Sequence, residues 1–106
     1  MRHDKALFQR WVDELELDHE FRTGSMFGTP AAFVGKRLAF GVYEANLCSK
    51  LPPEQVQKLL QSGVGHPFRP FGRPVMRGWI SLSPTEVPHD QLRELLIASL
   101  RFAGQR

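Results

Sequence analysis

Short alternating segments between residues 31 and 51 constrain the fold of this chain more than any other feature. In AAFVGKRLAFGVYEANLCSKL, apolar and polar or small residues alternate as in half-buried strands. The pattern predicts strands over 31–34, 38–43 and 47–51. Gly35-Lys36 has the length and composition of a tight hairpin turn between the first two. The sequence therefore predicts an antiparallel meander.

Within the strand over 38–43, alternation places Leu38, Phe40 and Val42 on one face. The preceding stretch, HEFRTGSMFGT, mixes strand-forming residues with glycine. It predicts a further short strand near 21–26.

Three segments have helical periodicity. Residues 4–17 have an apolar stripe and Asp4 as a plausible N-cap. Pro52-Pro53 ends the meander and begins a second helix, which Gly63 terminates. A third helix spans 87–103. The expected buried positions of the three helices are Leu7, Phe8, Trp11, Val12, Leu15, Val56, Leu59, Leu60, Leu92, Leu95, Leu96 and Leu100.

The segment GHPFRPFGRPVMRGW, residues 65–79, links the second helix to the last strand. Its prolines exclude a helix, and it contains three arginines and no acidic residue. We expect a strand over 75–82 with Met76, Ile80 and Leu82 on one face. In a structural interpretation, Phe68 and Phe71 fill the gap between the second helix and the sheet. In a functional one, the rings and arginines form a strip that binds nucleic acid.

The predicted order is helix, three or four strands, helix, one or two strands, helix. This order indicates an α+β fold in two layers, with helices packed on one face of an antiparallel sheet. The length of 106 residues fits a single domain over 1–106.

Charge is unevenly distributed along the chain. Residues 1–20 have six acidic and three basic side chains, whereas residues 21–83 have eight basic and two acidic ones. This asymmetry favours an anionic partner for the basic middle, or packing of the two segments so that they neutralise each other. A candidate basic patch would form if the hairpin and the link converge, and its members would be Lys36, Arg37, Arg69, Arg73 and Arg77.

The residues do not indicate a catalytic centre or a cofactor. No two of the four histidines have a spacing that places them on one face of a helix or strand, so no metal site is predicted. Cys48 could pair with His66 or His89, but a lone cysteine in a strand is more typical of a buried apolar position. The glycines at 24, 28 and 35 do not match a phosphate-binding loop. We therefore expect a protein that is not an enzyme.

A single cysteine excludes an internal disulfide framework, and the charged start lacks the apolar stretch of a signal peptide. No apolar run approaches the length of a membrane helix. These features predict a cytoplasmic protein without membrane contact. An unpaired edge of a short sheet also favours a homodimer.

Several short motifs occur in an order that resembles the N-terminal domain of the TfoX/Sxy proteins over about residues 21–103. The matching pieces are Met26-Phe27-Gly28, Gly35-Lys36, Leu51-Pro52-Pro53-Glu54, Pro67-Phe68, Gly72-Arg73, Met76 and Trp79. Thr29 departs from that pattern, where a second glycine is common.

The resemblance implies a two-layer α+β fold similar to the secretion-chaperone-like group. It also implies a role in transcriptional or competence regulation through contacts with a protein partner, and it supplies no catalytic residues. The alternative function is direct nucleic-acid binding by the basic central segment.

Overall fold

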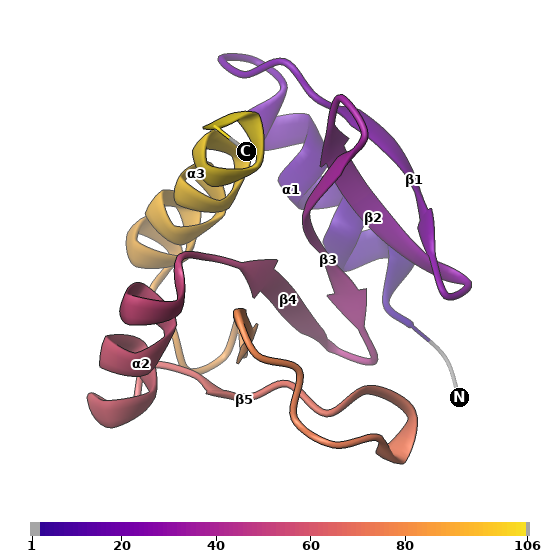
Figure 1. The fold of residues 1–106 in the computed structure, drawn as a ribbon. Coiled ribbons are helices and arrows are strands. Elements are labelled where there is room, and N and C mark those ends of the chain that lie inside the picture. The colour runs from indigo at the N-terminus through magenta and orange to yellow at the C-terminus, as the bar shows by residue number, and fades with distance from the viewer. Residues whose placement is uncertain (1–2, 106) are drawn as a thin grey trace.

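The structure, a computed structural model, describes residues 3–105 and has the predicted α+β layout, with a helix at each end and one in the middle (Figure 1). In chain order its elements are α1 (Lys5–Leu15), β1 (Arg22–Met26), β2 (Thr29–Val34), β3 (Arg37–Tyr43), β4 (Asn46–Lys50), α2 (Pro53–Gln61), β5 (His66–Pro67), a 3-10 turn (Pro70–Gly72), β6 (Trp79–Leu82) and α3 (His89–Gln105).

The described strands form one antiparallel sheet in the order β1-β2-β3-β4-β6-β5. The first four follow one another as the predicted meander. After α2 the chain forms the short edge strand β5, and β6 then inserts between β5 and β4. The free edges of the sheet are therefore β1 and the two-residue strand β5.

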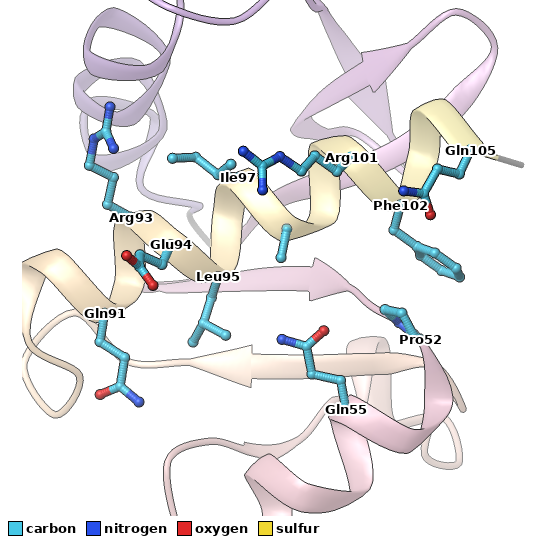
Figure 2. Close-up of a pocket in the computed structure, with 11 residues that line it drawn as sticks. Pro52, Gln55, Gln91, Arg93, Glu94, Leu95, Ile97, Arg101, Phe102 and Gln105 are labelled. Carbon is cyan, nitrogen blue, oxygen red and sulfur yellow. The ribbon is translucent and has the colours of Figure 1, made fainter.

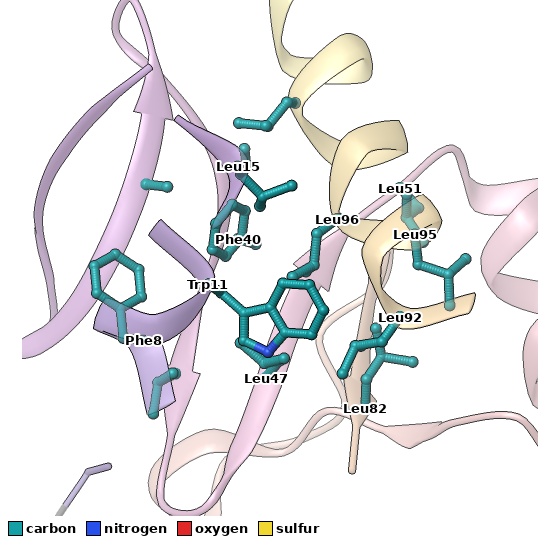
Figure 3. Packing of buried hydrophobic residues seen from close by; sticks show 14 of the residues in the cluster. Phe8, Trp11, Leu15, Phe40, Leu47, Leu51, Leu82, Leu92, Leu95 and Leu96 are labelled. Carbon is teal, nitrogen blue, oxygen red and sulfur yellow. The ribbon is translucent and has the colours of Figure 1, made fainter. Parts of the chain in front are cut away.

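All three helices contribute to one apolar core on the same face of the sheet. The Asp4 carboxylate caps α1 as predicted, accepting the Leu7 N–H at 2.9 Å. Figure 3 shows side chains of α1 and α3 meeting those of β3, β4 and β6. The predicted stripes of α1 and α3 are buried, whereas in α2 only Val56 is fully buried, with Leu59 and Leu60 partly covered.

The predicted face of Leu38 is wrong. The pairing of β2 with β3 shifts between Ala32 and Phe33, so that Phe40 pairs with Ala32 but Leu38 pairs with Phe33. The extra residue, Ala39, joins the helix-side core together with Phe40. This β-bulge turns Leu38 to the opposite face of the sheet.

The face of the sheet away from the helices has a smaller core, which the 65–79 link covers. Its buried members are Cys48, Phe68 and Trp79. Phe68 therefore does not fill the gap between α2 and the sheet, as the sequence suggested, because it packs on the other side. Phe71 is not core either, since 46% of its surface is exposed.

The predicted strand over 75–82 is also shorter than expected. It begins only at Trp79, after a turn in which Gly78 has a φ of 81°. Met76 consequently packs with the smaller core, whereas Ile80 and Leu82 lie in the helix-side core. Within residues 3–105, no helix has the length and apolar character needed to cross a membrane.

Candidate functional site

Three turns meet at one end of the sheet. They are the β1–β2 turn at Phe27-Gly28, the β3–β4 turn at Glu44-Ala45, and the 3-10 turn of the link. In Figure 1 the link extends from β5 toward the end of the sheet where the β3–β4 turn lies. The Phe71 ring centroid is 5.1 Å from that of Tyr43 and 6.3 Å from that of Phe27. The contact therefore joins segments that are far apart in sequence.

Four rings gather here, and we call them the aromatic patch: His3, Phe27, Tyr43 and Phe71. His3 lies against Tyr43 with a centroid distance of 5.0 Å. The two phenylalanines are the exposed members, with 62% of Phe27 and 46% of Phe71 accessible to solvent. The patch is thus an apolar surface that faces water.

Hydrogen bonds hold the patch in place. The Phe71 N–H donates to Tyr43 Oη at 2.6 Å, which ties the link to the end of β3. The Glu44 N–H donates to His3 Nδ1 at 2.9 Å, and the Asp4 N–H donates to the Glu44 carbonyl at 2.8 Å. These two bonds anchor the segment before α1 to the same turn. Tyr43 also packs edge-on against buried Phe68, so the patch rests on the smaller core.

The backbone under the patch is strained. Among residues 3–105, Phe27, Glu44 and Phe71 are the non-glycine residues with positive φ, and all three lie in or beside the patch. Phe27 and Gly28 have φ values of 54° and 79°, the signs of a type I′ hairpin turn, whose first position favours asparagine. A bulky residue in this conformation costs about 1 kcal/mol. Such strain concentrates at functional sites.

Arg73 lies beside the patch, with its guanidinium carbon 6.0 Å from the Phe27 ring centroid. This arrangement is a cation–π contact at an exposed position. Arg73 is thus the member of the predicted basic patch that the structure brings to the exposed rings.

Of the other predicted basic residues, Arg69 directly precedes the turn that holds Phe71, and the remaining three lie elsewhere. Lys36 and Arg37 are at the β2–β3 turn, the opposite end of β2 from Phe27, which is roughly 17 Å away at the rise of a strand. Arg77 lines a hollow against α2, and Arg69 is exposed just before the 3-10 turn. The five residues therefore do not form one continuous patch.

Two acidic residues near the start of the chain, Glu14 in α1 and Asp18 just after it, pair with side chains of α3. Arg93 lies 3.2 Å from Glu14 and 3.1 Å from Asp18, and His89 lies 2.9 Å from Glu14. These acids are therefore paired with the last helix and not with the basic middle of the chain.

Cys48 is a buried member of the smaller core, with 1% of its surface exposed. Burial raises the pKa of its thiol to about 12. A hydrogen bond with the Gly41 backbone lowers the pKa, but by less than burial raises it. The two histidines considered as its partners bond elsewhere, His66 to Glu86 and His89 to Glu14. Cys48 has the environment of a core residue, because a reactive cysteine needs a lowered pKa.

A groove of about 680 Å³ runs between α2 and α3 (Figure 2). Gln55 reaches into it from α2, and Gln91, Glu94 and Arg101 line it from α3. These α3 side chains are exposed, and the groove has no nucleophile beside a base. Across residues 3–105 there is also no cluster of three His, Cys, Asp or Glu side chains that could hold a metal ion.

The sequence interpretation missed the aromatic patch, because it assigned Phe71 to the core and treated Phe27 only as part of a motif. A signal was present: each phenylalanine directly precedes a glycine at a position where the chain must turn. Turns of this kind favour asparagine or glycine, so the backbone preference of the turn does not explain a phenylalanine at that position.

No protein-family model matches this chain, and no curated protein or solved structure is significantly similar to it. The resemblance to the TfoX N-terminal domain therefore stays a prediction from the sequence.

Proposed function

We propose that this protein is a non-catalytic interaction domain that binds a protein partner through the aromatic patch. The observation that supports this most is the pair of exposed phenylalanines, Phe27 and Phe71, each with a φ of 54°. Both residues have a strained backbone conformation, and neither ring is fully buried in return. Burial of these rings by a partner would recover apolar contact area that the isolated chain leaves in water.

Aromatic anchors of this kind dominate protein–protein interfaces, where they fill pockets of the partner. The hydrogen bonds of Tyr43 and His3 fix the surrounding turns, so little ordering is needed on binding. The resemblance to TfoX N-terminal domains supports a partner in transcriptional or competence regulation. A buried free cysteine fits a reducing compartment, and we propose that the protein acts in the cytoplasm.

A capture experiment from native lysate tests this function. The wild-type domain and a Phe27→Asn/Phe71→Asn variant are immobilised, and bound proteins are quantified by mass spectrometry. Asparagine tolerates positive φ, so the variant removes the rings while preserving the turns. We expect a set of proteins that the wild type binds and the variant loses at least tenfold.

A matched control removes exposed apolar side chains outside the patch. Leu17 is 81% exposed and Val75 is 40% exposed, so Leu17→Asn/Val75→Asn should bind the same proteins as the wild type. Equal capture by the wild type and the ring-deleted variant would refute the proposal.

Nucleic-acid binding is the second candidate, and the contact between Arg73 and Phe27 favours it. An exposed ring beside a guanidinium can stack on an unpaired base while the charge meets a phosphate. In this case the partner would be a single strand that crosses the end of the sheet.

Fluorescence anisotropy with single-stranded DNA and RNA distinguishes the two candidates. Binding to phosphates must weaken steeply with added salt. If the second candidate holds, Arg73→Gln should weaken binding about tenfold, and Lys36→Gln at the distant turn much less. Absence of salt-sensitive binding would eliminate it.

A further inference from the structure

We infer that the free edge of β1 pairs with the β1 strand of a second copy of this chain, in antiparallel orientation about a two-fold axis at Gly24. This inference goes beyond the proposed function and uses mainly the backbone edge of the sheet, which meets the aromatic patch only at the Phe27-Gly28 turn and Arg73. It depends on the hydrogen-bonding pattern of β1, the obstruction of the other edge, and the charges at the two ends of the strand.

The pairing with β2 determines which β1 groups face outward. In an antiparallel pair, alternate residues exchange both backbone hydrogen bonds with the opposite strand. Ser25 lies opposite Pro30, which has no N–H, so this pair cannot be of the bonded kind. The bonded positions are then Arg22, Gly24 and Met26. The N–H and C=O groups of Thr23 and Ser25 are therefore directed away from β2, to the open edge.

β1 has few of the features that protect an edge strand. Residues 22–25 are exposed, and the strand has no proline, lysine or bulge. The opposite edge is protected, because β5 has only two residues and the second is Pro67. Within residues 3–105, β1 is thus the edge of this sheet that can accept another strand.

An axis at Gly24 makes this edge self-complementary. Thr23 of each copy lies opposite Ser25 of the other, and the outward groups of these residues form four hydrogen bonds. The two Gly24 residues meet on the axis as a non-bonded pair, where two strands approach most closely. Glycine permits this approach because it has no side chain. Arg22 lies opposite Met26, so like charges do not face each other.

The charges at the ends of β1 are also complementary. Glu20 lies just before the strand, and in this register it reaches the Phe27-Gly28 turn of the second copy, where Arg73 lies over the Phe27 ring. Both Glu20 and Arg73 are exposed, and neither has an ion-pair partner within residues 3–105. The dimer therefore gains two symmetric pairs between Glu20 and Arg73.

Analytical ultracentrifugation of the purified protein tests the dimer. The wild type should sediment as a reversible dimer at submillimolar concentration. Ser25→Pro removes an outward N–H that β2 does not use, and it should sediment as a monomer with its circular dichroism spectrum unchanged. Ser25→Thr retains the N–H and should dimerise as the wild type does.

Charge reversal tests the antiparallel orientation of the two β1 strands without placing a proline in the strand. Glu20→Arg and Arg73→Glu should each weaken the dimer about tenfold, because each places like charges together twice. An equimolar mixture of the two variants should recover the wild-type affinity, since both pairs become attractive in the mixed dimer. A monomeric wild type, a Ser25→Pro dimer of unchanged affinity, or a mixture no tighter than the single variants would overturn the inference. Purified protein suffices throughout, so these results are independent of whether the aromatic patch captures a partner.

Discussion

Cys48 shows how burial determines the chemical behaviour of a cysteine side chain. From the sequence, Cys48 was either a buried apolar residue of a strand or a nucleophile paired with His66 or His89. In the structure Cys48 is buried with Phe68 and Trp79 in the smaller core, and the pKa of its thiol is raised from 9.0 to about 12 because burial disfavours the thiolate.

This shift predicts a loss of stability at alkaline pH. Well below pH 9.0 the thiol is protonated in both the folded and the unfolded chain, so it causes no pH dependence there. Above that pH the unfolded chain ionises first. The free energy of unfolding should then fall by up to about 1.4 kcal/mol per pH unit until the folded thiol itself ionises near pH 12.

Urea unfolding of the wild type and Cys48→Ala across this range isolates the contribution of the thiol to the pH dependence of stability. The alanine variant has a lower baseline because it leaves a small cavity. Its stability should fall less steeply than that of the wild type above pH 9.0. Parallel curves for the two proteins would show that the thiol is not protected by the fold.

At the scale of elements, α1 and α3 are joined by more than apolar packing. Arg93 of α3 contacts both Glu14 and Asp18, and His89 stacks on Trp11 with a centroid distance of 4.7 Å. These contacts tie the first helix to the last, although the two helices are far apart in sequence.

Removal of the guanidinium should loosen this attachment. We expect Arg93→Gln to lower the free energy of unfolding by about 1 kcal/mol, since two partly exposed ion pairs are lost together. The loss should shrink at high salt. Arg101→Gln, on an exposed part of the same helix, is the matched control in thermal or urea unfolding. Equal stability of the two variants would mean that the ion pairs contribute nothing.

The strands show where prediction from sequence ends at this scale. Alternation and Gly35 were sufficient to predict the β2–β3 hairpin, because both act locally. The bulge at Ala39, opposite Ala32 and Phe33, was not predictable, since it depends on how β3 meets β2 and α3 at the same time. One extra residue was enough to move Leu38 to the opposite face.

At the scale of the whole molecule, the predicted α+β layout and helix-side core are confirmed, because apolar stripes and turn residues specify them. The predicted path of the 65–79 link was wrong. The prolines of the link exclude a helix, but they do not determine which face of the sheet the link covers. The aromatic patch depends on this path. Phe71 reaches Tyr43 and Phe27 only because the link returns across the face opposite the helices.

The central claim is that the exposed rings are retained for binding and not for the stability of the fold. The free energy of unfolding of Phe27→Asn tests it most directly. Phe27 is 62% exposed and occupies the first position of a type I′ turn, where asparagine is favoured. Phe68→Ala, which removes a buried ring of the smaller core, provides the comparison and should lose about 3 kcal/mol. The account predicts that Phe27→Asn is more stable than the wild type by about 1 kcal/mol. A loss of stability comparable to that of Phe68→Ala would contradict the account, because Phe27 would then be part of the core.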